Sequence, residues 1–145
     1  MRIILVTVMV GIGGVFGALA RYGTAVLLNE RDLLPWGTLA VNLAGCFLLA
    51  LFLTVILGRL NSGSLFVLSV STGFIGSFTT FSAISVESIL LLYSFAHLAL
   101  LYLSLTLVLG YLCTWAGYAL GNLILCTGWG ERWCGRLPAG GKVHD

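Results

Sequence analysis

Four long apolar stretches take up most of this 145-residue sequence and restrict its fold more than any other feature. They cover residues 3–28, 37–57, 65–93 and 97–126. A helix that crosses a bilayer needs about 20 mostly apolar residues, and each stretch meets that length. With 59% hydrophobic and only 8% charged residues, the chain lacks the polar surface of a soluble domain. We therefore predict an all-α integral membrane protein whose residues 1–126 form four transmembrane helices.

The segments outside these stretches leave little room for an extramembrane domain. The connections are short, and residues 127–145 form a Gly-rich tail with mixed charge, to which we assign no chemistry. The four cysteines do not have the spacing of a metal site, and no Lys/Arg cluster indicates nucleic-acid binding. No nucleophile–base pair is visible, so we do not expect an enzyme. We expect the function to lie within the transmembrane helices, which contact one another and membrane lipid.

A polar, flexible segment interrupts the third apolar stretch. Residues 73–82 read GFIGSFTTFS, and apolar residues lie on both sides of them. In the middle of a membrane, glycines and hydroxyls are unfavourable unless protein, water or ions satisfy the backbone groups they release. A helix broken near the bilayer midplane brings backbone carbonyls to a dehydrated ion. The segment therefore predicts a broken third helix and indicates ion permeation.

Other polar side chains recur at helical spacing within the predicted spans. Thr38 and Asn42 are four residues apart and share a helix face, as do Tyr102 and Thr106. A single hydroxyl in a membrane helix commonly bonds back to its own helix, so no one of them indicates function alone. Taken together with Thr79, Thr80 and Ser82, however, they are numerous enough to line a path.

Three segments resemble the helix signatures of the Fluc/CrcB fluoride channels. They are residues 13–22 (GGVFGALARY), 37–45 (GTLAVNLAG) and 73–82 (GFIGSFTTFS), in the order and at the spacing of that family. The resemblance covers about residues 5–120. It implies an antiparallel, dual-topology dimer of four-helix subunits in the cell inner membrane, with two fluoride pathways. It also implies passive, fluoride-selective export from the cytoplasm that lowers fluoride toxicity.

The resemblance also implies roles for individual residues. The carbonyls of Gly76 and Thr79 would hold a structural Na⁺ ion at the dimer centre. Phe81 would present its ring edge to fluoride, and Asn42 would offer its amide near the pore. The remaining matched positions form two groups. A polar track for fluoride would comprise Thr38, Thr80, Ser82, Tyr102 and Thr106. Arg21 and Glu87 would hold vestibule or structural positions.

The chain departs from the family pattern at one position. The family usually has a second pore-facing phenylalanine three residues after the first, and here that position is Ile84. An isoleucine offers no polarised ring edge, so conduction rate or selectivity is expected to differ, or one pathway to be degraded.

The charge distribution bears on how subunits pair. If the N-terminus is cytoplasmic, the basic residues of the tail favour one orientation under the positive-inside rule. Without the tail, Arg2 and Arg59 on one side stand against Arg31 and Arg21 on the other, which is close to balanced. The dimer partner is therefore either a second copy of this chain or an inverted paralogue.

Two other functions remain open at this level. A small four-helix, proton-coupled multidrug exporter needs a membrane-embedded carboxylate, and Glu87 is the only candidate, because the other acidic residues lie in polar connections or the tail. A membrane scaffold that transports nothing predicts no ion flux at all.

Overall fold

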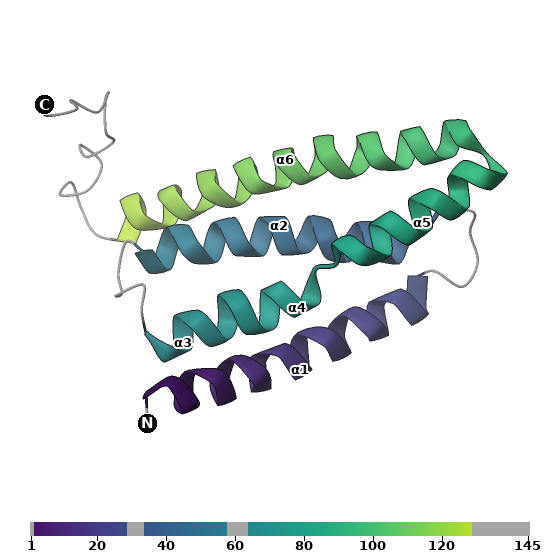
Figure 1. Ribbon diagram of the computed structural model, residues 1–145. Helices are drawn as coiled ribbons and strands as arrows, with labels where there is room; N and C mark the ends of the chain where they lie inside the picture. The colour runs from purple at the N-terminus through teal and green to yellow at the C-terminus, as the bar shows by residue number, and fades with distance from the viewer. Residues whose placement is uncertain (1, 29–33, 58–63, 129–145) are drawn as a thin grey trace, which may run out of the picture.

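The computed structural model describes residues 2–28, 34–57 and 64–128, and all of its elements are helices (Figure 1). Three are continuous: α1 (Arg2–Leu28), α2 (Trp36–Leu57) and α6 (Ala96–Gly128). The third span consists of several consecutive pieces, which are α3 (Leu65–Leu68), the π-helix η1 (Ser69–Ile75), α4 (Gly76–Phe78) and α5 (Phe81–Ser94).

Four of these segments are long and apolar enough to cross a membrane: Ile3–Leu28, Trp36–Ile56, Leu65–Ser94 and Ala96–Thr127. This confirms the prediction of an all-α membrane fold with four spans, and the bounds differ from the predicted ones by only a few residues. The fourth helix runs on to Gly128, so the rest of the predicted tail lies outside the described residues.

The predicted break in the third span is also confirmed, and it falls at Thr79 and Thr80. These two residues lie in the middle of the 30-residue span Leu65–Ser94. Both have extended backbone angles, with φ −76° and ψ 154° at Thr79, and φ −148° and ψ 122° at Thr80. The Thr80 side chain then accepts a hydrogen bond from the Ala83 amide, so it caps the N-terminus of α5.

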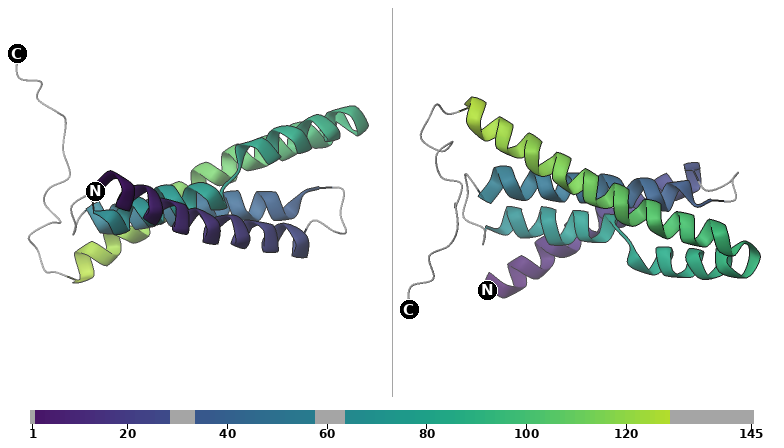
Figure 2. Two further views of the ribbon diagram at one scale, coloured as in Figure 1. Left: turned by 60° about the horizontal axis from the view of Figure 1, so that its bottom comes forward. Right: turned by 90° about the horizontal axis from the view of Figure 1, so that it is seen from above.

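The two halves of the third span pack against different helices. The first half, in η1 and α4, lies against α1, whereas α5 lies against α6. The long helices α2 and α6 pack along each other, and α2 also contacts α1, η1, α4 and α5. The hairpin of α5 and α6 extends beyond the ends of α1 and α2 (Figures 1 and 2). The break thus lies between two packed pairs of helices that α2 joins.

A small buried core fills the space among α2, α5 and α6. Its members are Leu39, Ile84, Leu91, Ala99 and Tyr102. Most other large apolar side chains are exposed in the isolated chain, as expected for a surface that meets lipid or another subunit.

Glycines bring α1 into backbone contact with η1. A Cβ atom added at Gly13 would overlap the Ser69 carbonyl, and one added at Gly17 would overlap the Phe74 carbonyl. Helices without side chains at the contact approach closely, which is how small residues stabilise helix pairs in lipid. The Ser69 hydroxyl also donates a 2.6 Å hydrogen bond to the Met9 carbonyl across this contact.

We predict that Gly17→Ala destabilises the fold by about 1–3 kcal/mol, because the added methyl group must displace backbone. Gly11→Ala is the matched control on the same helix, since a Cβ there meets nothing within 4 Å. The control is expected to be neutral, or stabilising by up to about 1 kcal/mol from helix propensity. Unfolding in detergent micelles measures both variants, and equal effects would contradict the packing role of Gly17.

Candidate functional site

The break is held by a buried amide on α2. Asn42 is 8% exposed. Its Oδ1 accepts a 2.8 Å hydrogen bond from the Thr80 amide, and its Nδ2 donates to the carbonyls of Thr80 at 3.1 Å and Thr38 at 2.9 Å. Backbone groups that lose their helical partners are costly in a membrane unless something else bonds them. Asn42 supplies both bonds that the extended Thr80 requires.

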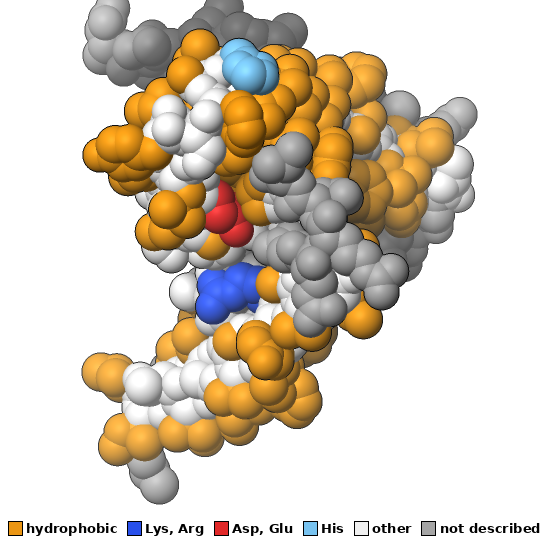
Figure 3. Space-filling view, turned by 90° about the vertical axis from the view of Figure 1, so that its right-hand side faces the viewer, with side chains coloured by type: hydrophobic (Ala, Val, Ile, Leu, Met, Phe, Trp, Pro, Cys, Tyr) orange, Lys and Arg blue, Asp and Glu red, His pale blue; other side chains and the backbone are white. Residues whose placement is uncertain are grey.

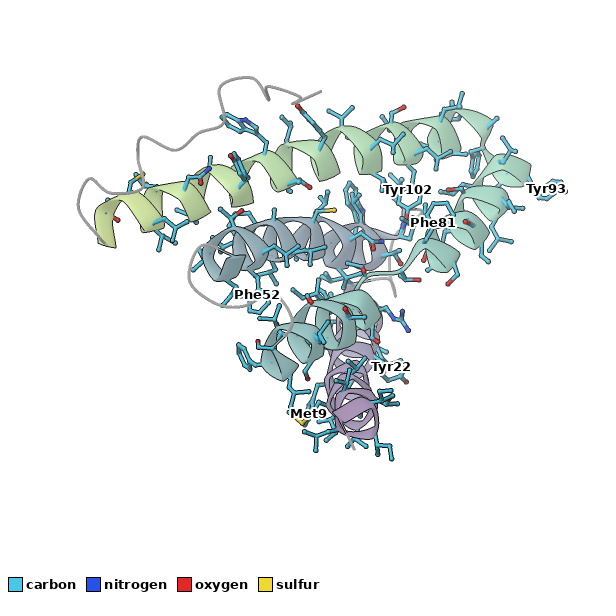
Figure 4. The ribbon with its side chains drawn as sticks, turned by 60° about the vertical axis from the view of Figure 1, so that its left-hand side comes forward. Met9, Tyr22, Phe52, Phe81, Tyr93 and Tyr102 are labelled. Carbon is cyan, nitrogen blue, oxygen red and sulfur yellow. The ribbon has the colours of Figure 1, made fainter. Side chains whose placement is uncertain are left out.

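A second polar cluster surrounds Glu87 of α5. It includes Thr38, which lies one turn before Asn42 on α2. Thr38 donates a 2.6 Å hydrogen bond to one carboxyl oxygen, and the Tyr102 hydroxyl donates a 2.9 Å bond to the other. Thr38 is 4% exposed and Tyr102 is fully buried. The cluster therefore ties α2, α5 and α6 together at a half-buried carboxyl group. Figure 4 shows Tyr102 on the side of α6 that faces α5.

A groove of about 500 Å³ opens between α1 and α5. Arg21 lines it from α1 and Glu87 from α5, and Figure 3 shows a basic and an acidic side chain on its facing walls. Thr38, Thr80 and Ser82 contribute polar atoms to the same walls. The groove therefore offers both a cation and several hydroxyls to a small ion that enters it.

A second hollow of about 370 Å³ lies on the other side of the break. Its walls include Asn42, Thr79, Thr80, Phe81 and Thr106, together with the apolar Ile84 and Leu107. Phe81 is the first residue of α5 and is 81% exposed, so its ring is accessible at this hollow (Figure 4). Thr80 lines both hollows, which places the break at their shared wall.

The residues expected along one path are thus divided between two hollows. Thr38, Ser82, Arg21 and Glu87 line the groove, whereas Asn42, Phe81 and Thr106 line the second hollow. Gly76 is on the exposed surface of the chain and lines neither.

Several of the expected donors are engaged within the chain. The Thr106 hydroxyl donates to the Tyr102 carbonyl, and the Thr79 hydroxyl donates to the Ile75 carbonyl. Both are hydroxyls bonded back to their own helix. The Thr80 and Ser82 hydroxyls lie 3.2 Å apart beside Phe81, at the exposed end of α5.

Two further residues stand out although the sequence pattern did not single them out, and of the two only Cys46 lines a hollow. Cys46 lines the second hollow, and its position four residues after Asn42 is the signal that could have placed it on the same face. The Ser88 hydroxyl is buried and has no hydrogen-bond partner within the described residues. Ile84, the departure from the family pattern, is 9% exposed and belongs both to the core and to the wall of the second hollow.

The fold and the site define a small polytopic membrane protein with polar hollows on both sides of a broken helix. A family model described as "CrcB-like protein, Camphor Resistance (CrcB)" matches residues 8–118. The chain belongs to this family.

Several curated relatives are similar over most of their length. A protein of Bacillus cereus (strain ZK / E33L) named "Fluoride-specific ion channel FluC 1" is 45% identical over 125 residues, which cover 83% of this chain and 90% of the relative. Proteins named "Fluoride-specific ion channel FluC" from Acidobacterium capsulatum and Thermosipho melanesiensis are 41% and 37% identical. Those alignments cover 80% and 79% of this chain, and 95% and 94% of the relatives.

We predict that Tyr102→Phe destabilises the fold by about 2 kcal/mol, because one oxygen of Glu87 loses its donor inside the protein. The ring itself is kept, so packing changes little. Tyr111→Phe removes a hydroxyl from an exposed position of the same helix and serves as the control. Unfolding of both variants in detergent gives the comparison. Equal stability of the two variants would show that the Tyr102–Glu87 bond contributes nothing.

Proposed function

We propose that this chain forms a fluoride-selective channel in the cell inner membrane and exports fluoride from the cytoplasm by passive permeation. The observation that carries the proposal is the break at Thr79 and Thr80, flanked by polar hollows, in a chain up to 45% identical to proteins named as fluoride-specific ion channels. The relatives are named as channels, not as enzymes. Open permeation suffices for protection, because fluoride that enters as HF is released in a near-neutral cytoplasm.

The residues beside the break suit a small, strongly hydrated anion. Such an ion must exchange water for several weak donors if it is to enter the pore and still leave it. The hydroxyls of Thr80 and Ser82 and the exposed ring of Phe81 supply weak positive potential beside the break. The hydroxyls of Thr38, Tyr102 and Thr106, expected to extend this track, donate to Glu87 or to the Tyr102 carbonyl, so we propose that they support its walls. We propose that Arg21 and Glu87 form its vestibule.

We also propose a structural Na⁺ ion bound by the carbonyls of Gly76 and Thr79. Neutral oxygen ligands suit hard cations. In a continuous helix the Gly76 carbonyl would accept the Thr80 amide, but that amide donates to Asn42 instead. When bound, the cation would add positive potential near the anion path.

The assembly that we propose is an antiparallel dimer. Gly76 and Phe81 both lie on the exposed surface of the isolated chain, so a second subunit is needed to enclose them. We favour a second copy of this chain, since the basic residues outside the tail are nearly balanced between the two sides. An oppositely oriented paralogue is the alternative partner.

The proton-coupled exporter receives no support. The relatives are named as ion channels, and both Glu87 oxygens accept hydrogen bonds inside the protein.

We predict rapid fluoride efflux, with little chloride efflux, from liposomes that contain this purified chain alone. A fluoride electrode measures fluoride efflux, and chloride efflux is measured in parallel. Phe81→Ile is expected to slow fluoride efflux by about tenfold, because the variant lacks the positive ring edge that would face the anion. Phe66→Ile changes another exposed ring of the third span and should leave the rate unchanged.

No fluoride efflux from folded wild-type protein would contradict self-sufficient conduction, and co-expression with a paralogue would then test the alternative partner. If Phe81→Ile does not slow fluoride efflux, the Phe81 ring is not part of the fluoride pathway.

We predict that the chain inserts in both orientations when it is expressed alone. A cysteine introduced in the tail of a variant without its native cysteines, and labelled with an impermeant reagent in intact cells and in lysed cells, measures the two populations. Roughly equal labelling would show that the near-balanced charges outside the tail, and not the basic residues of the tail, set the orientation. A single orientation would exclude the antiparallel homodimer and leave the paralogue as partner.

A further inference from the structure

The Asn42 side chain has no amide hydrogen left for a permeating anion. A primary amide carries two donor hydrogens. In this structure one donates to the Thr38 carbonyl at 2.9 Å and the other to the Thr80 carbonyl at 3.1 Å. The side chain lines the second hollow, yet it is 8% exposed and directs its donors at backbone. Its role is therefore different from that of an anion ligand.

The pairing of Asn42 with Thr80 selects one backbone conformation. The amide of Asn42 bonds both the N–H and the C=O of a single residue, as a neighbouring strand does in an antiparallel sheet. These two groups point to the same side only when the residue is extended, as Thr80 is with φ −148° and ψ 122°. In a helix they point in opposite directions along the axis. Asn42 thus stabilises the break over a continuous helix.

The same arrangement releases two particular carbonyls. In a continuous helix the Thr80 amide would bond the Gly76 carbonyl, and the Ala83 amide would bond the Thr79 carbonyl. Here the Thr80 amide donates to Asn42, and the Ala83 amide donates to the Thr80 hydroxyl at 3.2 Å. Both carbonyls are thereby separated from their helical donors. They are the two carbonyls proposed above as ligands of Na⁺.

We infer that Asn42 is a positioning residue that acts on the permeation path through the backbone of Thr80. It holds Thr80 extended, so that the Gly76 and Thr79 carbonyls are available to the cation, and it does not bind fluoride itself. This differs from the expectation that its amide contacts the anion. The inference rests on the proposed channel function and its cation.

The first test is amide hydrogen exchange at Thr80, which does not depend on flux. In the wild type this amide is expected to be protected although it lies at a helix break. Asn42→Ala should speed its exchange by about tenfold, the equivalent of one lost hydrogen bond. Asn42→Asp keeps an acceptor for the amide and should retain the protection. Leu49→Ala changes an exposed residue of α2 that lines neither hollow, so it is the control and should leave the exchange at Thr80 unchanged.

The second test separates positioning from anion binding. In liposomes of the Asn42→Ala variant, the Na⁺ concentration for half-maximal fluoride flux should rise about tenfold or more, the usual effect of removing a group that orients metal ligands. The fluoride concentration for half-maximal flux should stay at its wild-type value. A purely structural defect would lower the active fraction and move neither concentration.

Several outcomes would overturn the inference. One is a wild-type Thr80 amide that exchanges as fast as an unprotected one, which decides the matter even if Asn42→Ala does not fold. Another concerns the Asn42→Ala variant: its fluoride concentration for half-maximal flux rises, while its Na⁺ concentration for half-maximal flux and its exchange rate at Thr80 stay at their wild-type values. A wild-type fluoride flux that does not depend on Na⁺ would contradict the proposal that Asn42 makes the two carbonyls available to a cation. Absence of wild-type fluoride flux would instead refute the proposed function, and the exchange measurement would still report on Thr80.

Discussion

Two hydrogen bonds between the Asn42 amide and the backbone of Thr80 make a broken membrane helix sustainable in this chain. Lipid offers no partner to a peptide group that leaves a helix, so the partner must come from the protein. Asn42 provides it from α2, and Thr38, one turn away, anchors Glu87 on the far side of the break. Because α2 contacts both halves of the third span, its position fixes where the break opens and which surfaces flank it.

The packing on each side of the break is of a different kind. Toward the N-terminal half, glycines let α1 approach the backbone of η1, and van der Waals contact dominates. Toward the C-terminal half, α5 meets α6 through a small apolar core and the hydrogen bonds around Glu87. The two halves pack mainly against different helices, and α2 contacts both. The two hollows therefore share a wall, Thr80, whose geometry depends on polar bonds more than on apolar packing.

Hydropathy was sufficient to predict the four spans, and the glycines and threonines of residues 73–82 located the break, because both signals are local. Partners of polar groups are not local. Thr38 and Glu87 are 49 positions apart in sequence, and nothing in either residue type reveals that one bonds the other. Asn42 was expected near a pore on the basis of a motif, yet a motif cannot show where its amide hydrogens point. The division of the expected residues between two hollows likewise depends on how the helices pack, which no local pattern records.

The length of α6 has a mechanical consequence. Its 33 residues correspond to a helix about 50 Å long, whereas the hydrocarbon core of a bilayer is about 30 Å thick. Such a helix fits by inclining to the membrane normal or by extending its ends among the headgroups. A thinner bilayer would require a stronger incline of α6. Because α2 packs along α6, its orientation would change with that of α6. Acyl-chain length is therefore coupled, through helix inclination, to the side chains that keep the third span open.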